Sequence, residues 1–555
     1  MTVQEKLGLL FKNTQARLPK SRKAVNIALV LLVLALVVGG TLLNGPGNPP
    51  GPPLYKLYPE NTSFYLQFRP GELLSRRLLV FLDNKTRRQV SKTSKDEESD
   101  VFFTGLLEKF NTTFEPHFSF GIWPAADNFK SSLTLLAFPL KESLSLADLA
   151  TRFNWQADDF KPASYSGVSV LVDRDSGIAL AVVDGNFLIA SNRKAMKTVL
   201  ENRSQHAPCV FDHPTNKKYL RKLPAKRDGT LVLNNTVYAE HALQNRQYMP
   251  APVLQKMERF ATILPVTLAS LSVEENTAEE NTEEKDTEGN AYLHVQSVTP
   301  LVLKGFDNKD FRKDLRAIYS QSIAFKTPNT MPQDTSFLLA WAGVDRFYDF
   351  YTKHLTTPEE KTVLRFTNDF LKSKDMDLRK DVVGLLEGEA ALMLRKKSKK
   401  PLLLFTKTGE KEKKLTRLTG LLSMAPVPIE QKKEQFGNTS ATTLVVPGKD
   451  LRISFGSVGP IMGFGITPHF ADLVKVKERD MKSLAQDSTY QHMTRRLPRK
   501  ANGLFYVRFK PSPNNPPSRW IRMASGAVWA RKEGDADIVF GKFTLKLVND
   551  PEAKS

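Results

Sequence analysis

The sequence predicts an α+β protein with two tandem copies of a unit built from an antiparallel sheet and helices, placed behind one N-terminal transmembrane helix. Three observations lead to this prediction. Residues 24–43 form a long apolar run without a charge. The stretch "PENTSFYL" at residues 59–66 returns as "PQDTSFLL" at residues 332–339, with five of eight residues unchanged. Strand patterns come mostly as hairpins and do not alternate one by one with helices, which favours antiparallel pairing.

The first 53 residues divide into three segments by charge and composition. The apolar run at 24–43 is 20 residues long and, at about 1.5 Å per residue, matches the roughly 30 Å hydrocarbon core of a bilayer. The alternative is a cleaved signal peptide, but the run is long for one and no A-x-A-like cleavage site follows. Residues 1–23 carry six Lys or Arg against one Glu, which predicts a basic cytoplasmic tail with everything after the span outside the cytoplasm. Residues 44–53, "NGPGNPPGPP", are predicted to form an extended Pro/Gly linker.

A second match at the same spacing supports the duplication. The stretch "LPAKRDG" at residues 223–229 returns as "LPRKANG" at residues 497–503. The prolines of the two motifs are 165 residues apart in the first copy and 166 in the second. Two matches at nearly equal separation are hard to produce by chance. We therefore place the copies at 54–310 and 327–550.

Each copy is predicted to contain strand hairpins followed by helices. Asp184 and Gly185 lie between two apolar runs, which indicates a type I′ turn because both of its central residues need positive φ. A helix is predicted in the ten residues from Ser191, and another at 467–474, where Thr467 is expected to be the cap. A further helix is predicted by apolar residues at i, i+3, i+4 and i+7, namely Val344, Phe347, Tyr348 and Tyr351.

The arrangement resembles a bacterial family known as a domain of unknown function, number 3352. The matching stretches are "YPENTSFYL" at 58–66, "YSGVSVLVDRDSGIALAVVDGNFLIAS" at 165–191 and "DLRKDVVGLLEGEAALML" at 377–394. The resemblance implies an N-terminal membrane helix before a long extracytoplasmic region. Because the family has no assigned activity, the resemblance implies an architecture and no chemistry. The chain departs from the family by an acidic insertion at 274–288.

Charge points to anionic partners. The net charge is +21, although residues 274–288 alone carry eight acids against one lysine and are predicted to form an unstructured loop. Such a surplus favours anionic lipid or an acidic envelope polymer, whereas nucleic acid is not expected outside the cytoplasm. Two basic clusters are the candidate contacts, the first of them at a predicted hairpin tip: Arg395, Lys396, Lys397, Lys399 and Lys400, and then Arg495, Arg496, Arg499 and Lys500. Lysine-rich tips also serve simply to discourage edge pairing.

Residues that could perform chemistry are few. His206, Cys209 and His213 lie close together in "HAPCVFDH", but a structural zinc site needs a second pair of ligands, and a buried structural thiol is the simpler interpretation. The carboxylates between Asp377 and Glu389 could form a glycosidase-type pair, yet they equally suit a solvated face. The glycine-rich stretch at 455–465 lacks the residues of a phosphate-binding loop. No catalytic, metal or cofactor site is predicted.

The sequence therefore favours a non-enzymatic protein, anchored by a single membrane span, that acts as an envelope scaffold or interaction protein. The alternative is a membrane-tethered carrier or sensor for a lipid or other hydrophobic ligand, which would need a closed apolar cavity. A third hypothesis, an extracytoplasmic hydrolase, would need a cleft in which acidic or histidine side chains converge.

Overall fold

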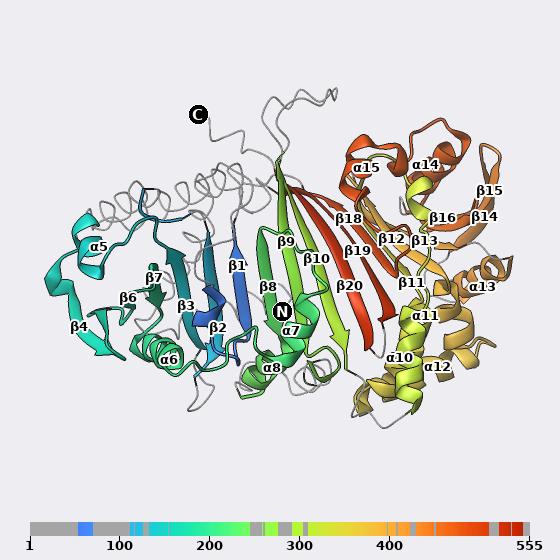
Figure 1. The fold of residues 1–555 in the computed structure, drawn as a ribbon. Helices are drawn as coiled ribbons and strands as arrows, with labels where there is room; N and C mark the ends of the chain where they lie inside the picture. Colours follow the sequence, from blue (N-terminus) through green and yellow to red (C-terminus); the bar gives the residue numbers. More distant parts are fainter. Residues whose placement is uncertain are drawn as a thin grey trace. The chain divides into compact units, whose positions relative to one another are not determined.

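The computed structural model of the chain describes fifteen stretches of sequence (Figure 1): residues 54–69, 112–115, 117–125, 132–153, 155–244, 258, 261–275, 291–302, 309–396, 398–406, 409–421, 429–448, 451–509, 521–533 and 536–547. The predictions for residues 1–23, 24–43 and 44–53 lie outside these stretches. So does most of the acidic insertion, of which only Glu274 and Glu275 are described.

The predicted fold class is wrong. The twenty strands found in the described residues belong to a single sheet, and each pairing below whose register is known is antiparallel. None of the helices in the described stretches is long and apolar enough to cross a membrane. By its internal contacts the chain divides into two compact units, each described by itself. Unit 1 is residues 1–249, 266–291 and 549–555, and unit 2 is residues 250–265 and 292–548.

Nine strands of unit 1 pair in the order β4-β5-β6-β7-β3-β2-β1-β8-β9. Their bounds are β1 Phe64–Phe68, β2 Phe118–Pro124, β3 Ser132–Pro139, β4 Phe160–Tyr165, β5 Val168–Asp173, β6 Ala179–Val183, β7 Asn186–Ala190, β8 Gly229–Asn234 and β9 Val266–Glu275. The helices are η1 Leu54–Leu57, α5 Leu146–Arg152, η2 Ala157–Asp159, α6 Arg193–Ser204, α7 Pro214–Leu220 and α8 Asn235–Gln244. Helix α6 packs against β3, β6 and β7 through buried side chains that include Met196 and Leu200.

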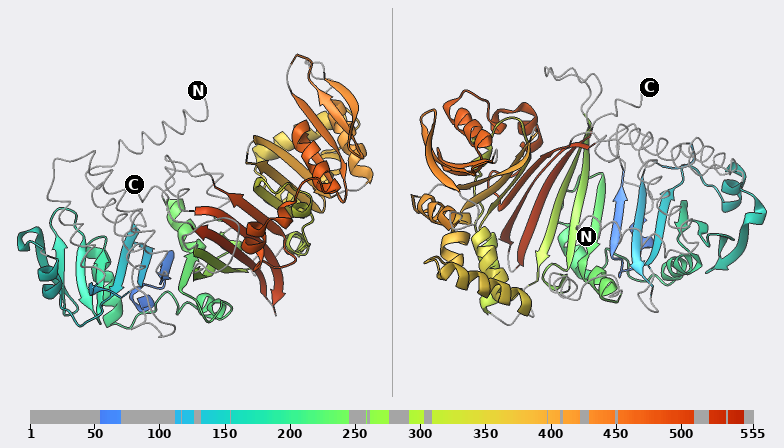
Figure 2. Two further views of the ribbon diagram at one scale, coloured as in Figure 1. Left: turned by 90° about the horizontal axis from the view of Figure 1, so that it is seen from above. Right: turned by 180° about the vertical axis from the view of Figure 1, so that it is seen from behind.

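Unit 2 pairs its strands in the order β14-β15-β16-β17-β13-β12-β11-β18-β19-β20. Their bounds are β11 Thr335–Ala342, β12 Glu389–Arg395, β13 Ser398–Thr406, β14 Glu430–Phe436, β15 Thr439–Val445, β16 Arg452–Val458, β17 Ile461–Ile466, β18 Gly503–Arg508, β19 Ile521–Glu533 and β20 Ala536–Leu547, with β10 Ala291–Leu301 beside β20. The long β19 and β20, drawn in red, lie side by side in both views of Figure 2.

The helices of unit 2 cover this sheet and its ends. They are α10 Lys309–Tyr319, η4 Thr327–Asn329, α11 Val344–His354, α12 Pro358–Lys372, the π-helical turn η5 Leu378–Val382, η6 Val383–Leu386, α13 Gly409–Gly420, α14 Thr467–Glu478, η8 Leu484–Gln486 and α15 Ser488–Thr494. Helix α14 packs against β16 and β17, and α15 against β19 and β20. The main buried cluster joins Phe470 and Leu473 of α14 to Leu338 of β11, Met393 of β12 and Leu404 of β13.

The two units share one pairing pattern. Adding ten to each strand label in the order of unit 1 reproduces nine consecutive strands of unit 2. The turn before the central strand is also the same, because Thr62 Oγ1 donates to the Pro59 carbonyl at 2.6 Å and Thr335 Oγ1 donates to the Pro332 carbonyl at 2.6 Å. Strand β10, which the sequence places in the first copy, pairs with β20 of unit 2. Strand β20 thereby gains a partner for backbone groups that would otherwise lie at the edge of the sheet.

The structure confirms some of the predicted turns and helices and corrects one predicted cap. Asp184 and Gly185 have φ of 50° and 72°, so the hairpin turn is confirmed. Helix α14 forms as predicted, but Ile466 is its N-cap residue, and the Thr467 hydroxyl instead contacts the Ser454 hydroxyl at 2.9 Å. Helix α11 also forms as predicted, with Asp345 and Phe350 buried and Phe347 44% exposed.

Candidate functional site

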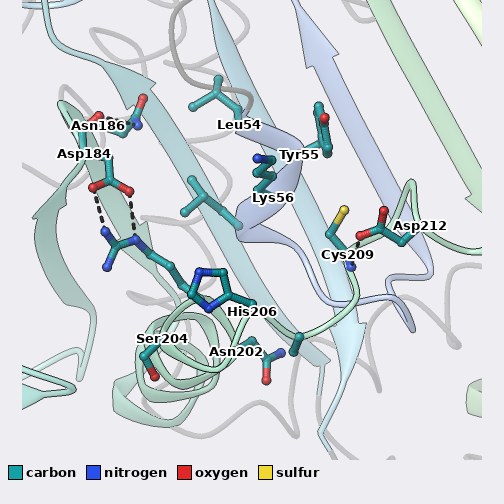
Figure 3. Close-up of a pocket in the computed structure, with 13 residues that line it drawn as sticks. Leu54, Tyr55, Lys56, Asp184, Asn186, Asn202, Ser204, His206, Cys209 and Asp212 are labelled. Carbon is teal, nitrogen blue, oxygen red and sulfur yellow. Dashed lines mark hydrogen bonds and ion pairs between the residues drawn. The ribbon is translucent and has the colours of Figure 1, made fainter.

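A pocket of about 580 Å³ lies in unit 1 (Figure 3). Its walls come from η1, from the turn between β6 and β7, from the C-terminal end of α6 and from the segment that follows it. The η1 wall is more than 120 residues away in sequence from the other walls, and the packing of α6 against the sheet and η1 brings them together. The lining mixes apolar residues such as Leu54 and Leu57 with charged, amide and hydroxyl side chains.

An ion pair closes one side of the pocket. Arg203, near the end of α6, donates through Nε to Asp184 Oδ2 at 2.8 Å and through Nη2 to Asp184 Oδ1 at 2.6 Å. Both side chains are partly exposed, so the pair contributes only about 0–1 kcal/mol to stability. It nevertheless ties the helix end to the β6–β7 turn and fixes the position of both charges.

Further polar groups face the pocket from other directions (Figure 3). Lys56 of η1 and His206, after α6, are exposed, and His206 has a left-handed backbone with φ of 52°. Asn186 at the start of β7 is buried and donates through Nδ2 to the Asp184 carbonyl at 3.0 Å. Its Oδ1 has no hydrogen-bond partner in the part of the chain that the structure describes.

Cys209 has a structural role at the edge of this pocket. Its segment pairs with Pro59, and in unit 2 Ser483 makes the corresponding bridge to Pro332. The backbone amide of Cys209 donates to Asp212 Oδ2 at 3.0 Å, which holds the turn. Burial raises the pKa of the Cys209 thiol to about 11, so the thiol is protonated at neutral pH and is a poor nucleophile.

The structure also bears on the metal hypothesis for the His206–His213 segment. His206 and Cys209 line the pocket, whereas His213 lies outside its lining, before the first turn of α7. Within the described residues no group of three or more His, Cys, Asp or Glu is arranged to hold a metal ion.

The first basic cluster lies at the turn between β12 and β13, but its members differ. Arg395 is largely buried and donates to both oxygens of Asp334, at 2.9 and 2.7 Å, and to Asp472 of α14. Its charge is therefore used to join β11, β12 and α14. Lys396 and Lys400 are exposed. Lys397, and the side chain of Lys399, lie outside the described part.

The second basic cluster lies elsewhere in unit 2. Arg495, Arg496, Arg499 and Lys500 are exposed between α15 and β18. Arg395 is paired with Thr335 at the start of β11, whereas Gly503, just after the second cluster, is paired with Trp341 near the end of β11. The two clusters thus lie near opposite ends of one strand, and the structure does not bring them together.

The carboxylates between Asp377 and Glu389 hold the backbone in place. Glu389 is buried and accepts hydrogen bonds from the amides of Lys326 and Thr327, both at 2.9 Å. Asp377 caps η5 by accepting from the Lys380 amide at 2.8 Å. These contacts occupy both oxygens of Glu389 and one oxygen of Asp377, which a glycosidase pair would need to leave open to substrate.

The glycine-rich stretch forms the β16–β17 hairpin. A Cβ on Gly463 would lie 2.8 Å from Leu473 of α14, and one on Gly465 would overlap Leu402 of β13. Close packing of a helix and a neighbouring strand therefore accounts for these glycines.

Comparison with known proteins gives one match. The family described as "Protein of unknown function (DUF3352)" matches residues 117–527, more than half of the chain. The chain belongs to the DUF3352 family. Neither the comparison with curated proteins nor that with solved structures finds a match.

The DUF3352 match spans the β6–β7 turn and α6 but not η1, so it includes only part of the pocket wall. Sequence reasoning weighed His206 and Cys209 but missed Lys56, Arg203 and Asn186 as neighbours. No short-range pattern could have found them, because Lys56 meets its neighbours only after η1 has packed against α6.

Proposed function

We propose that this DUF3352 protein is a non-enzymatic, membrane-anchored scaffold or interaction protein that works outside the cytoplasm. The observation that carries the proposal is how its polar side chains are used. Glu389 accepts hydrogen bonds from backbone amides, Asp487 caps α15, and Arg395 is enclosed by two carboxylates. Groups with these roles stabilise the fold and are not open to a substrate.

The proposed location follows from the sequence. In this proposal residues 24–43 hold the chain in a membrane by a single span, residues 1–23 stay in the cytoplasm, and residues 44–53 link the span to the rest of the chain. The support is the charge-free apolar run and the excess of Lys and Arg before it.

The proposed partners are anionic. Lys396 and Lys400 at one site, and Arg495, Arg496, Arg499 and Lys500 at the other, are exposed and would meet anionic lipid or an acidic envelope polymer. Arg395 is left out of this set because its guanidinium is held by Asp334 and Asp472.

Protease accessibility tests the location. A protease added to intact spheroplasts should digest the region beyond Pro53, because that region faces outward. A variant that carries Leu34→Arg and Leu36→Arg should leave the membrane fraction, since each arginine at the centre of a span costs about 2.5–3.5 kcal/mol of insertion free energy. Protection of the region until the cells are lysed would overturn the proposal.

A further inference from the structure

Among the described residues of unit 2, the large apolar side chains with the highest exposed fractions lie on α12. Val363 is 65% exposed, Phe366 is 76% exposed and Phe370 is 54% exposed. Their spacing of i, i+3 and i+7 places all three on one face of the helix, whereas the buried Leu371 lies on another face. Single exposed hydrophobic residues are common, but an aromatic stripe along one helix face indicates a surface that is covered in use.

The helix that bears this stripe is formed in advance. Thr357 and Glu360 make a reciprocal capping box, with Pro358 in the first turn. Tyr351 of the neighbouring α11 donates its hydroxyl to Glu360 Oε1 at 2.9 Å. Figure 1 shows α12 beside α10 and α11. Docking through the stripe therefore needs no folding of the helix.

Area argues against a second copy of the chain as the occupant. The two phenylalanine rings together expose on the order of 250 Å², since a Phe side chain presents about 200 Å². A stable protein interface buries about 800 Å² on each partner. An amphipathic helix at a bilayer surface, by contrast, needs to bury only its apolar stripe.

The net charge of the chain, although not that of α12, favours a bilayer that contains anionic lipid. Lys361, Arg365 and Lys372 of α12 are exposed, and none of them has an ion-pair partner among the described residues. The acids of α12 balance these three cations, so the stripe itself supplies the affinity. The attraction to anionic headgroups comes from the chain as a whole, whose net charge is +21.

We infer that α12 docks on the surface of an anionic phospholipid bilayer, with Val363, Phe366 and Phe370 inserted at the level of the headgroups. The inference rests on the proposed function, because it requires the chain to be held at a membrane. It adds a second, reversible contact by which unit 2 lies on the lipid surface.

A fluorescent probe beside the stripe tests the inference. The full chain carries Cys209→Ser, which mirrors Ser483 of unit 2, and Thr362→Cys labelled with an environment-sensitive dye. It is reconstituted into vesicles of phosphatidylglycerol and phosphatidylcholine. The matched control places the same label at Tyr238→Cys on α8, where the native side chain is 55% exposed. We expect emission at position 362 to rise at least two-fold and to be quenched by spin-labelled lipid, with no change at position 238.

The outcomes separate the two proposals. Phe366→Glu with Phe370→Glu should abolish the rise at position 362 without unfolding the chain, because both side chains are exposed. No rise in a chain that floats with the vesicles would overturn the inference and leave the proposed function standing. Failure to float with the vesicles would overturn both. Concentration-dependent disulfide cross-linking of unlabelled Thr362→Cys chains in vesicle-free detergent would identify a second copy as the occupant and also overturn the inference.

Discussion

Replacing Arg395 by alanine should destabilise unit 2 although the residue belongs to a lysine-rich surface cluster. The side chains of Arg395 and Asp472 are each only 15% exposed, and that of Asp334 is 34% exposed. Removing one partner of a fully buried ion pair costs about 3–5 kcal/mol, because the remaining charge is left without compensation. Since these groups keep some contact with water, we expect a loss of about 2–3 kcal/mol in the free energy of local opening.

Hydrogen exchange measured by mass spectrometry reports this loss where it occurs. The amides of β11 and β12 are paired with one another beside Arg395. If these amides exchange by local or global opening, a loss of about 2–3 kcal/mol raises their exchange rates by roughly 30- to 150-fold. Arg395→Lys should fall in between, because lysine keeps the charge but cannot bind Asp334 with two parallel hydrogen bonds.

Arg499→Ala is the matched control. Arg499 belongs to the second basic cluster and is exposed, so its removal should leave exchange in β11 and β12 unchanged. If Arg395→Ala and Arg499→Ala gave the same exchange rates within three-fold, the structural role assigned to Arg395 would be wrong. Arg395 would then again be a candidate contact for an anionic partner.

Three further predictions follow from buried groups. Burial lowers the pKa of His117 to about 4. As pH falls, His117 is therefore protonated in the unfolded chain before it is protonated in the folded chain, and the free energy of unfolding should drop by up to about 3 kcal/mol between pH 6.5 and pH 4. Urea unfolding at both pH values should show a smaller drop in the free energy of unfolding for His117→Gln than for the unchanged chain. Equal drops would show that His117 is not the group responsible. Because the pKa of Cys209 is raised to about 11, iodoacetamide at pH 8 should react with the native chain roughly 100-fold more slowly than with the urea-unfolded chain, and equal rates would disprove burial of the thiol. Gly503→Ala should cost about 1–3 kcal/mol by overlap with the Trp341 ring, whereas Gly420→Ala, with nothing within 4 Å, should be neutral in the same urea titration.

The sequence alone determined features that depend on neighbouring residues. The Asp184-Gly185 turn needs only a glycine and a residue that tolerates positive φ between two apolar runs. Helix α6 follows from its apolar spacing, and Asn192 caps it by accepting from the Ala195 amide at 2.9 Å. Motifs at equal spacing in the two halves of the chain likewise fall at equivalent positions, as Thr62 just before β1 and Thr335 at the start of β11 do.

Only the tertiary structure decided which distant groups meet. A strand such as β10 has the same local pattern whether its outer side faces water or β20, so the sequence could not show that these two strands pair. The same limit hid the role of Arg395, since its charge looks identical in sequence whether it faces solvent or the carboxylates of Asp334 and Asp472. Strand pairing and buried ion pairs depend on contacts between residues tens to hundreds of positions apart, and those contacts exist only once the chain has packed.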